Sequence, residues 1–262
     1  MAKTLLSRMT WKEVEETAAK KTVVLIPLGT TENQGPHNLL GLETYTTSIV
    51  AERAAQKTGA IVAPVLPFGA SALFEEFPGT IPLRPEVLKE VCTDILFALA
   101  RHGFDHLLFI NHHNPSGWAV EEACRNLTKS YGLVSGQVEI RLLFRQLAKD
   151  LYEGKTGVLG HGGDPGTSLM LYLFPNDVRT DLAQKDYFRA YQGLEAEGNT
   201  VQTFQGGKVN LYTSMKEVAP IGVSGDPTGG DPKIGEQAFG RVVDYVAAFV
   251  EKFKGMNTRV GK

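Results

Sequence analysis

The feature that most constrains the fold is an apolar run near the start of the chain that ends in a cluster of polar residues. The run from Val23 to Ile26 is rich in β-branched residues and is stopped by proline and glycine, which is typical of a buried strand. Glu32, Gln34 and His37 follow within a few positions. Ligands gather at the carboxyl ends of strands in open α/β sheets, so this loop is a candidate site.

A second predicted strand ends in the same way. Leu107 to Ile110 is an apolar run, and an Asn-His-His-Asn sequence, residues 111–114, follows it directly. Neighbouring parallel strands release their loops at the same edge of the sheet, so the two loops are expected to form two halves of one site. The alternative interpretation is that both are ordinary polar surface turns.

Predicted strands alternate with predicted helices along the chain. Strands are expected at 22–26, 61–66, 107–110 and 138–143, and helices after Thr10 and at 45–58, 85–102, 118–131 and 234–253. This alternation predicts a three-layer α/β/α fold with a mostly parallel sheet. No linker interrupts the 262 residues, so we expect a single domain over 1–262.

Two further segments carry candidate functional residues. Residues 67–80 form a long loop with three phenylalanines, which line either a pocket or an oligomer interface. Glycines flank His161, which lets the backbone approach a ligand closely. Asp164 either orients His161 or only turns the loop.

Residues 174–220 are irregular and polar, and we expect surface hairpins and interface segments there.

Composition excludes several classes of protein. A formal net charge of -2 does not suggest a nucleic-acid or anionic-membrane partner. No apolar run approaches the roughly 18 residues of a transmembrane helix, and no signal peptide is apparent. Cys92 and Cys124 lie far apart in helical patterns, which indicates reduced thiols rather than a zinc finger. We therefore expect a soluble, cytoplasmic protein.

Taken in order, these motifs resemble the creatininase (creatinine amidohydrolase) family across nearly the whole chain. The matching segments are residues 26–37, 77–80, 101–103, 110–114, 161–163 with 167–170, and 225–228. The resemblance implies a three-layer α/β domain, a homohexameric assembly, and a two-metal site of zinc or manganese that hydrolyses cyclic or linear C–N bonds.

The resemblance assigns Glu32, Glu43 and His113 to one metal ion. The two ligands that it assigns to the other ion are both replaced, a His by Gln34 and a Glu by Pro115. We therefore predict one divalent ion, zinc first and manganese second, with three protein ligands and a fourth position for water. Water bound there is the expected nucleophile.

His161 matches the histidine that the family uses in catalysis, although the preceding Glu of the family is Gly160 here. We expect His161 to carry a proton to the leaving atom. His112, where the family has Gly, fills the space of the missing ion, donates to an oxyanion or is simply exposed. The predicted substrate-binding residues are Gln34, His37, His112, Asn114 and Asp164.

Three functions remain open from the sequence. The first is a metal-dependent hydrolase of a small, polar, cyclic carbonyl compound, with an amide or lactam C–N bond as its target. The second is a ring-opening C–C hydrolase of a cyclic polyol ketone of the inosose type. The third is a non-catalytic, ligand-binding oligomer that has lost its metals. The expected partners are a small-molecule substrate and further copies of the chain, and neither nucleic acid nor membrane.

Overall fold

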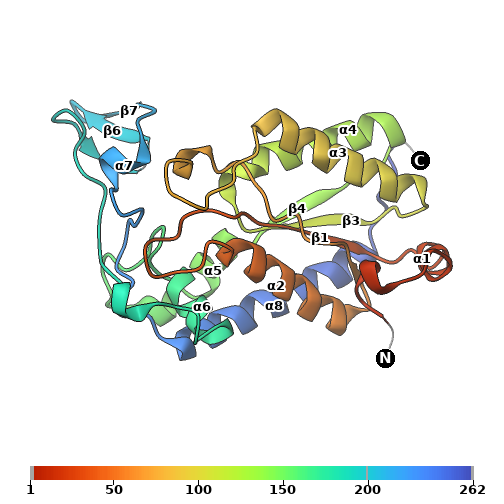
Figure 1. Ribbon diagram of the computed structural model, residues 1–262. Helices are drawn as coiled ribbons and strands as arrows, with labels where there is room; N and C mark the ends of the chain where they lie inside the picture. The colour runs from red at the N-terminus through yellow and green to blue at the C-terminus, as the bar shows by residue number, and fades with distance from the viewer. Residues whose placement is uncertain (1–2, 199, 261–262) are drawn as a thin grey trace.

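The computed structural model describes residues 3–198 and 200–260 (Figure 1). Its central sheet has four strands in the order β2-β1-β3-β4, and every pairing is parallel. The strands are β1 (Val24–Leu28), β2 (Ile61–Val62), β3 (Leu107–Asn111) and β4 (Gly136–Glu139). Helices cover both faces, which confirms the predicted three-layer α/β/α fold.

The helices divide between the two faces of the sheet. α3 and α4 lie on one face, and α2, α5, α6 and α8 lie on the other (Figure 1). A short helix, α1, follows the capping box that Thr10 and Glu13 form at its start. The bounds are α1 (Trp11–Ala18), α2 (Leu42–Thr58), α3 (Pro85–Arg101), α4 (Gly117–Tyr131), α5 (Ile140–Leu147), α6 (Gly166–Leu173), α7 (Met215–Val218) and α8 (Pro232–Lys254).

β1 and the first four residues of β3 are apolar because both faces of these central strands are covered. Val24 and Ile26 of β1 pack into the core under α3 and α4, whereas Leu25 packs into the core with α2 and α8. In β3, Leu107 and Leu108 divide between the same two cores. Alternate residues of a strand point to opposite faces, so a strand between two helical layers needs a continuous apolar run.

The predicted strand over 138–143 is wrong in its second half. The structure ends β4 at Glu139, where its partner β3 also ends, and starts α5 at Ile140. Beyond that point the chain has no strand to pair with. Ile140, Leu143 and Phe144 are buried together, and this spacing of three and four residues belongs to a helix.

The irregular region between α6 and α8 contains a small second sheet, as expected for surface hairpins. It is antiparallel, in the order β5-β6-β7, and projects from one end of the molecule (Figure 1). Its strands are β5 (Glu195–Ala196), β6 (Val201–Phe204) and β7 (Gly207–Asn210). Over residues 3–198 and 200–260, no helix is both long and apolar enough to cross a membrane.

Two glycines of α8 provide a matched test of the packing between α6 and α8. A Cβ added at Gly235 would lie 2.0 Å from the carbonyl oxygen of Ser168, whereas one added at Gly240 meets open space. We expect Gly235→Ala to lower the free energy of unfolding by about 1–3 kcal/mol. Gly240→Ala should raise it by roughly 0.5–1 kcal/mol through better helix propensity. Urea unfolding followed by circular dichroism measures both, and equal effects would contradict the close packing.

Candidate functional site

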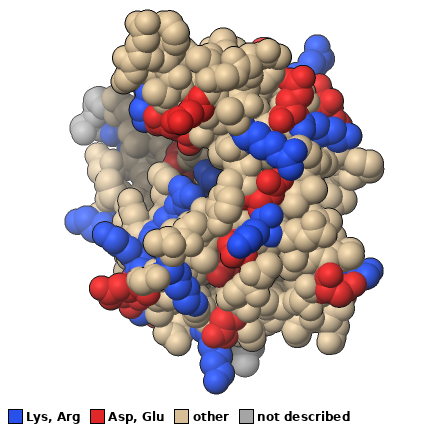
Figure 2. Space-filling model, turned by 90° about the vertical axis from the view of Figure 1, so that its left-hand side faces the viewer, with Lys and Arg blue, Asp and Glu red and all other residues tan. Residues whose placement is uncertain are grey.

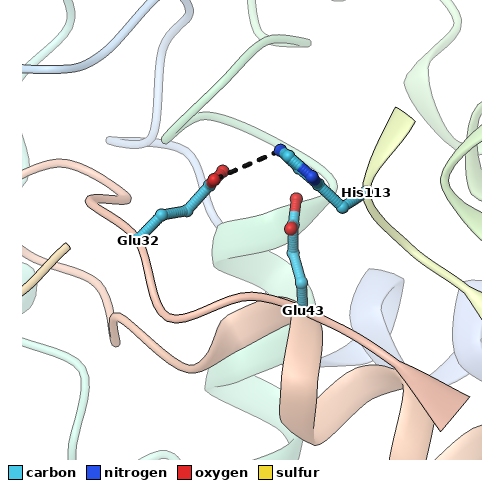
Figure 3. A group of neighbouring side chains, drawn as sticks. All are labelled: Glu32, Glu43 and His113. Carbon is cyan, nitrogen blue, oxygen red and sulfur yellow. Dashed lines mark ion pairs between the residues drawn. The ribbon is translucent and has the colours of Figure 1, made fainter. Parts of the chain in front are cut away.

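Three side chains from separate elements converge at the carboxyl end of the parallel sheet (Figure 3). Glu32 lies in the loop after β1, Glu43 in the first turn of α2, and His113 just after β3. One ligand atom from each lies within 4.8 Å of the others, and all three residues are buried. The Nε2 atom of His113 is 3.2 Å from Oε2 of Glu32. The structure thus brings together the three residues predicted to be metal ligands.

Close backbone packing sets the position of Glu43. A Cβ added at Gly29 would lie 2.4 Å from Cα of Thr44, so the end of β1 and the start of α2 touch directly. The hydroxyl of Thr44 donates to the carbonyl of Thr30 at 2.7 Å, and the hydroxyl of Thr30 donates to Oε2 of Glu43 at 2.5 Å. Together these contacts hold the carboxylate of Glu43 close to that of Glu32.

The ring of His113 is held through its far nitrogen. Its Nδ1 is 2.8 Å from Oγ of Ser116, which also accepts the backbone N–H of Ala70 at 3.1 Å. The backbone N–H of His113 donates to Oδ1 of Asn111 at 2.9 Å. These contacts leave Nε2 facing Glu32. Metal-ligating histidines are commonly oriented through the second ring nitrogen in this way.

The site has an excess of buried negative charge. Burial and the neighbouring charge of Glu32 raise the pKa of Glu43 to about 7. Burial also opposes ionisation of Glu32, but the charge of His113 outweighs it, and the pKa of Glu32 is lowered to about 2. Burial disfavours the protonated form of His113, yet Glu32 and Glu43 raise its pKa. One imidazolium cannot neutralise two carboxylates, so the site favours a further cation.

This set of donors fits a divalent metal ion. Two carboxylates and one imidazole are ligands that zinc and manganese both accept, and three protein ligands leave a position open for water. The Oε2 atom of Glu32 is buried and has no hydrogen-bond partner among the described residues. A cation there would satisfy that oxygen and would displace the proton from His113.

His161 lies beside these residues with a defined tautomer. Its Nε2 is 2.6 Å from the carbonyl oxygen of Asn33, which can only accept, so Nε2 carries the hydrogen. Nδ1 then has a free lone pair and lies 4.0 Å from Oε1 of Glu32. Burial lowers the pKa of His161, which Glu32 partly offsets. The ring of Phe74 stacks on the imidazole with centroids 4.0 Å apart. His161 is therefore a neutral base that faces the site.

The backbone before His161 passes very close to a second segment. A Cβ added at Gly160 would lie 1.5 Å from the carbonyl oxygen of Ser224. The amide of Ser224 donates to the carbonyl of His161 at 2.7 Å, and the amide of His161 donates to Oγ of Ser224 at 3.2 Å. These contacts fix the loop that presents His161, and they leave no room for a side chain at position 160.

A cavity of about 640 Å³ opens over the three converging side chains. Figure 2 looks onto this end of the molecule and shows a hollow in which acidic and basic atoms are both visible. One wall is apolar and includes Phe74, so the long loop 67–80 does line a pocket. Asn114 also lines the cavity. The cavity is also lined by Leu73, Phe188, Met215, Arg141, Arg145 and Glu197.

The predicted substrate-binding residues are distributed unevenly. A smaller cavity of about 40 Å³ adjoins Glu43, and Gln34, His112 and Asp164 line it. The amide of Gln34 donates to Oε1 of Glu32 at 3.3 Å. His112 is buried rather than exposed, with no hydrogen-bond partner for its Nδ1 within the described chain. Their roles toward a substrate stay predictions.

Asp164 and His37 make contacts that the sequence did not suggest. Asp164 accepts hydrogen bonds from the amide and the hydroxyl of Ser168, at 3.0 and 2.9 Å, and so supports the start of α6. The contact that orients His161 comes from Asn33 instead. His37 is bonded to Oγ1 of Thr167 at 3.0 Å and lines neither cavity. Its predicted substrate role stays untested.

Sequence reasoning missed two arginines, Arg141 and Arg145, that line both cavities. The predicted strand over 138–143 contains only Arg141, so it does not indicate that the two arginines share one face. Their spacing of four residues is the sequence pattern that indicates a shared position, since it places both side chains on one face of a helix. Ser116 and the carbonyl of Asn33 carried no sequence signal, because their roles depend on the folded geometry.

The converging ligands lead to a prediction about metal content. Protein purified without added metal should hold about one equivalent of zinc or manganese per chain, since three ligands define one ion site. His113→Ala should lose it, whereas His102→Ala, at the exposed end of α3, should retain it. Mass spectrometry of the metals measures this. Two equivalents would contradict a single ion, and no metal after dialysis against zinc would contradict the metal centre.

His37 makes a prediction about acid stability. Burial lowers its pKa from the ordinary value of 6.5 to about 4, so the unfolded chain binds a proton more readily than the folded one. Wild-type stability should therefore fall by roughly 3 kcal/mol through this group as the pH drops from about 6.5 to 4. His37→Gln should lack that component. Urea unfolding at several pH values, with chelator present, measures the difference, and parallel pH profiles would contradict it.

Comparison with known proteins places the chain among relatives of several activities. A creatinine amidohydrolase of Pseudomonas putida is 33% identical over 194 residues, covering 67% of this chain and 74% of the relative. A mycofactocin precursor peptide peptidase of Mycobacterium ulcerans (strain Agy99) is 29% identical and covers 84% and 81%. A 3-dehydro-scyllo-inosose hydrolase of Thermotoga maritima is 30% identical and covers 67% and 58%.

The fold is shared with solved creatininases. A mutant creatininase described as the Zn-Zn type has a TM-score of 0.82 at 23% identity, covering 98% of this chain and 100% of that one. A manganese creatininase has a TM-score of 0.80 at 24% identity, covering 97% and 100%. A family model described as creatinine amidohydrolase matches residues 7–250. The chain belongs to the creatinine amidohydrolase family and is a hydrolase.

Proposed function

We propose that this hydrolase cleaves the C–N bond of an amide, with a divalent ion held by Glu32, Glu43 and His113. The observation that carries the proposal is the convergence of these three buried side chains beside a neutral His161, at the floor of a cavity. A divalent ion bound there supplies a Lewis acid that polarises a carbonyl group and acidifies water.

The protein's own residues supply the proton transfers. His161 accepts a proton at Nδ1 and returns it to the leaving nitrogen, as general acid–base catalysis requires. The carbonyl of Asn33 accepts a hydrogen bond from Nε2–H whether the His161 ring is neutral or protonated. Glu32 lies close enough to stabilise the imidazolium. Phe74 covers one face of the ring and excludes water from it. The low pKa of His161 keeps the ring neutral before each turnover.

We propose a single ion, with zinc as the first candidate and manganese as the second. The family resemblance places ligands of another ion where this chain has Gln34 and Pro115. Gln34 directs its amide hydrogens toward Glu32, which is the wrong polarity for a metal ligand. The solved creatininases described as Zn-Zn and manganese forms support the choice of metals.

An amide is the preferred substrate because two of the similar relatives are named for amide cleavage, a creatinine amidohydrolase and a peptide peptidase. Ring-opening C–C hydrolysis of a cyclic polyol ketone is the second candidate. The inosose hydrolase of Thermotoga maritima and the polar Asn114 in the cavity favour it. The hexameric assembly and the cytoplasmic location expected from the sequence remain predictions.

A substitution of His161 tests the proposal. His161→Gln should lower kcat for amide hydrolysis by about 10²–10⁴-fold, because it removes the proton carrier while metal content stays unchanged. His102→Gln is the matched control and should keep full activity. Formation of creatine is measured with creatinine, amine release with short peptides, and ring opening with an inosose. Turnover of the inosose alone would favour C–C cleavage, and metal binding without any turnover would contradict the proposed function.

A further inference from the structure

Arg141 and Arg145 lie one helical turn apart on α5 and line both cavities. Arg141 is half-buried, and Arg145 is exposed at the opening. Within residues 3–198 and 200–260, neither guanidinium makes a hydrogen bond or an ion pair. Like charges spaced four residues apart on a helix repel each other, so this pair costs free energy unless an anion lies between them.

The acidic residues near the pair are engaged elsewhere. Asp150, just beyond α5, pairs with Arg241 at 2.5 Å. Glu139, just before α5, accepts from the amide of Gln137 at 3.3 Å. Glu197 lines the same cavity, but it pairs with Lys208 at 2.6 Å. Glu43 shares both cavities with the pair, and the charge of Arg141 partly offsets the rise that burial causes in the pKa of Glu43. Within the described residues, however, no carboxylate forms a hydrogen bond or an ion pair with either guanidinium, and both line a cavity that opens to solvent.

The arginine pair adjoins the metal-ligand cluster. Both residues share the smaller cavity with Glu43 and His161. Burial, and then the charge of Arg141, lower the pKa of His112, which precedes the ligand His113 in the chain. A molecule that reaches the cluster with one end would thus place another part within reach of the guanidinium groups.

Another part of the cavity lining is apolar. Leu73, Phe74, Phe188 and Met215 form it, whereas Asn114 and Glu197 add polar groups beside the cluster and the arginines. A volume of about 640 Å³ accommodates a ligand of ordinary metabolite or short-peptide size. The cavity therefore has three parts, which are the cluster, an apolar wall and a cationic wall.

We propose that Arg141 and Arg145 bind an oxyanion, a carboxylate or a phosphate, carried by the substrate of the amide hydrolysis. Guanidinium groups match the planar geometry of these anions and form paired, charge-assisted hydrogen bonds with them. The substrate is then an acidic amide with an apolar part, such as an N-acyl amino acid or the carboxyl end of a peptide. Creatinine, which has no carboxylate or phosphate, lacks the group that this wall recognises. The assignment of this anion to a substrate rests on the proposed function, whereas the anion-binding site itself does not depend on it.

The test compares a carboxylate ligand with its neutral amide and adds a phosphate ligand. N-Acetyl-phenylalanine, its neutral amide and phenyl phosphate are titrated into the metal-loaded protein by calorimetry. The wild type should bind an anionic probe at least about tenfold more tightly than the neutral amide. The double variant Arg141→Gln/Arg145→Gln should lose that preference at unchanged metal content and Tm. Arg101→Gln, at the exposed end of α3, should retain it.

Each outcome separates the possibilities. Preference for the carboxylate identifies an acidic acyl or peptide substrate, and preference for phenyl phosphate identifies a phosphorylated one. A wild type without preference overturns the proposal, as does a preference that survives in the double variant, because the metal would then be the anion site. Binding needs no turnover. Loss of hydrolysis with intact anion preference would therefore count against the proposed function alone.

Discussion

The burial of two carboxylates side by side is the constraint on which the site depends. Glu32 and Glu43 are both almost wholly inaccessible to solvent, and charges of the same sign in a dry environment are strongly unfavourable. The fold imposes this arrangement because the backbone of Gly29 touches that of Thr44 at the junction of β1 and α2. Compensating positive charge has to come from outside the pair, and His113, at the end of the neighbouring strand, provides only part of it.

The charged groups of the cavity are arranged around the two buried carboxylates, which require nearby positive charge. Negative groups lie at the floor and a neutral imidazole stands beside them. Two guanidinium groups, which have no ion-pair partner in the described part of the chain, also line the cavity. A polar, bifunctional molecule would be aligned by its charges before any bond is broken, which is the orientation effect that makes bound reactants react faster.

The sequence was informative where chemistry follows directly from strand ends. The apolar runs of β1 and β3 located the sheet edge, and family resemblance then selected Glu32, Glu43 and His113, which the structure brings together. It was less informative where a competing pattern decided the outcome. The strand expected at 138–143 ends at Glu139 and a helix begins at Ile140, because β3 offers no partner beyond Asn111 and the apolar spacing favours α5. For the same reason, the sequence did not indicate that Arg141 and Arg145 of α5 line the cavity.

The contact between Gly160 and Ser224 bears on how this chain could change over time. The family resemblance places a glutamate at position 160, but any side chain there would collide with a backbone carbonyl at 1.5 Å. A single substitution therefore cannot introduce a glutamate there, because the segment around Ser224 would have to move first. The loop that presents His161 and the segment around Ser224 are thus linked, so a change at position 160 requires a matching change in the second segment.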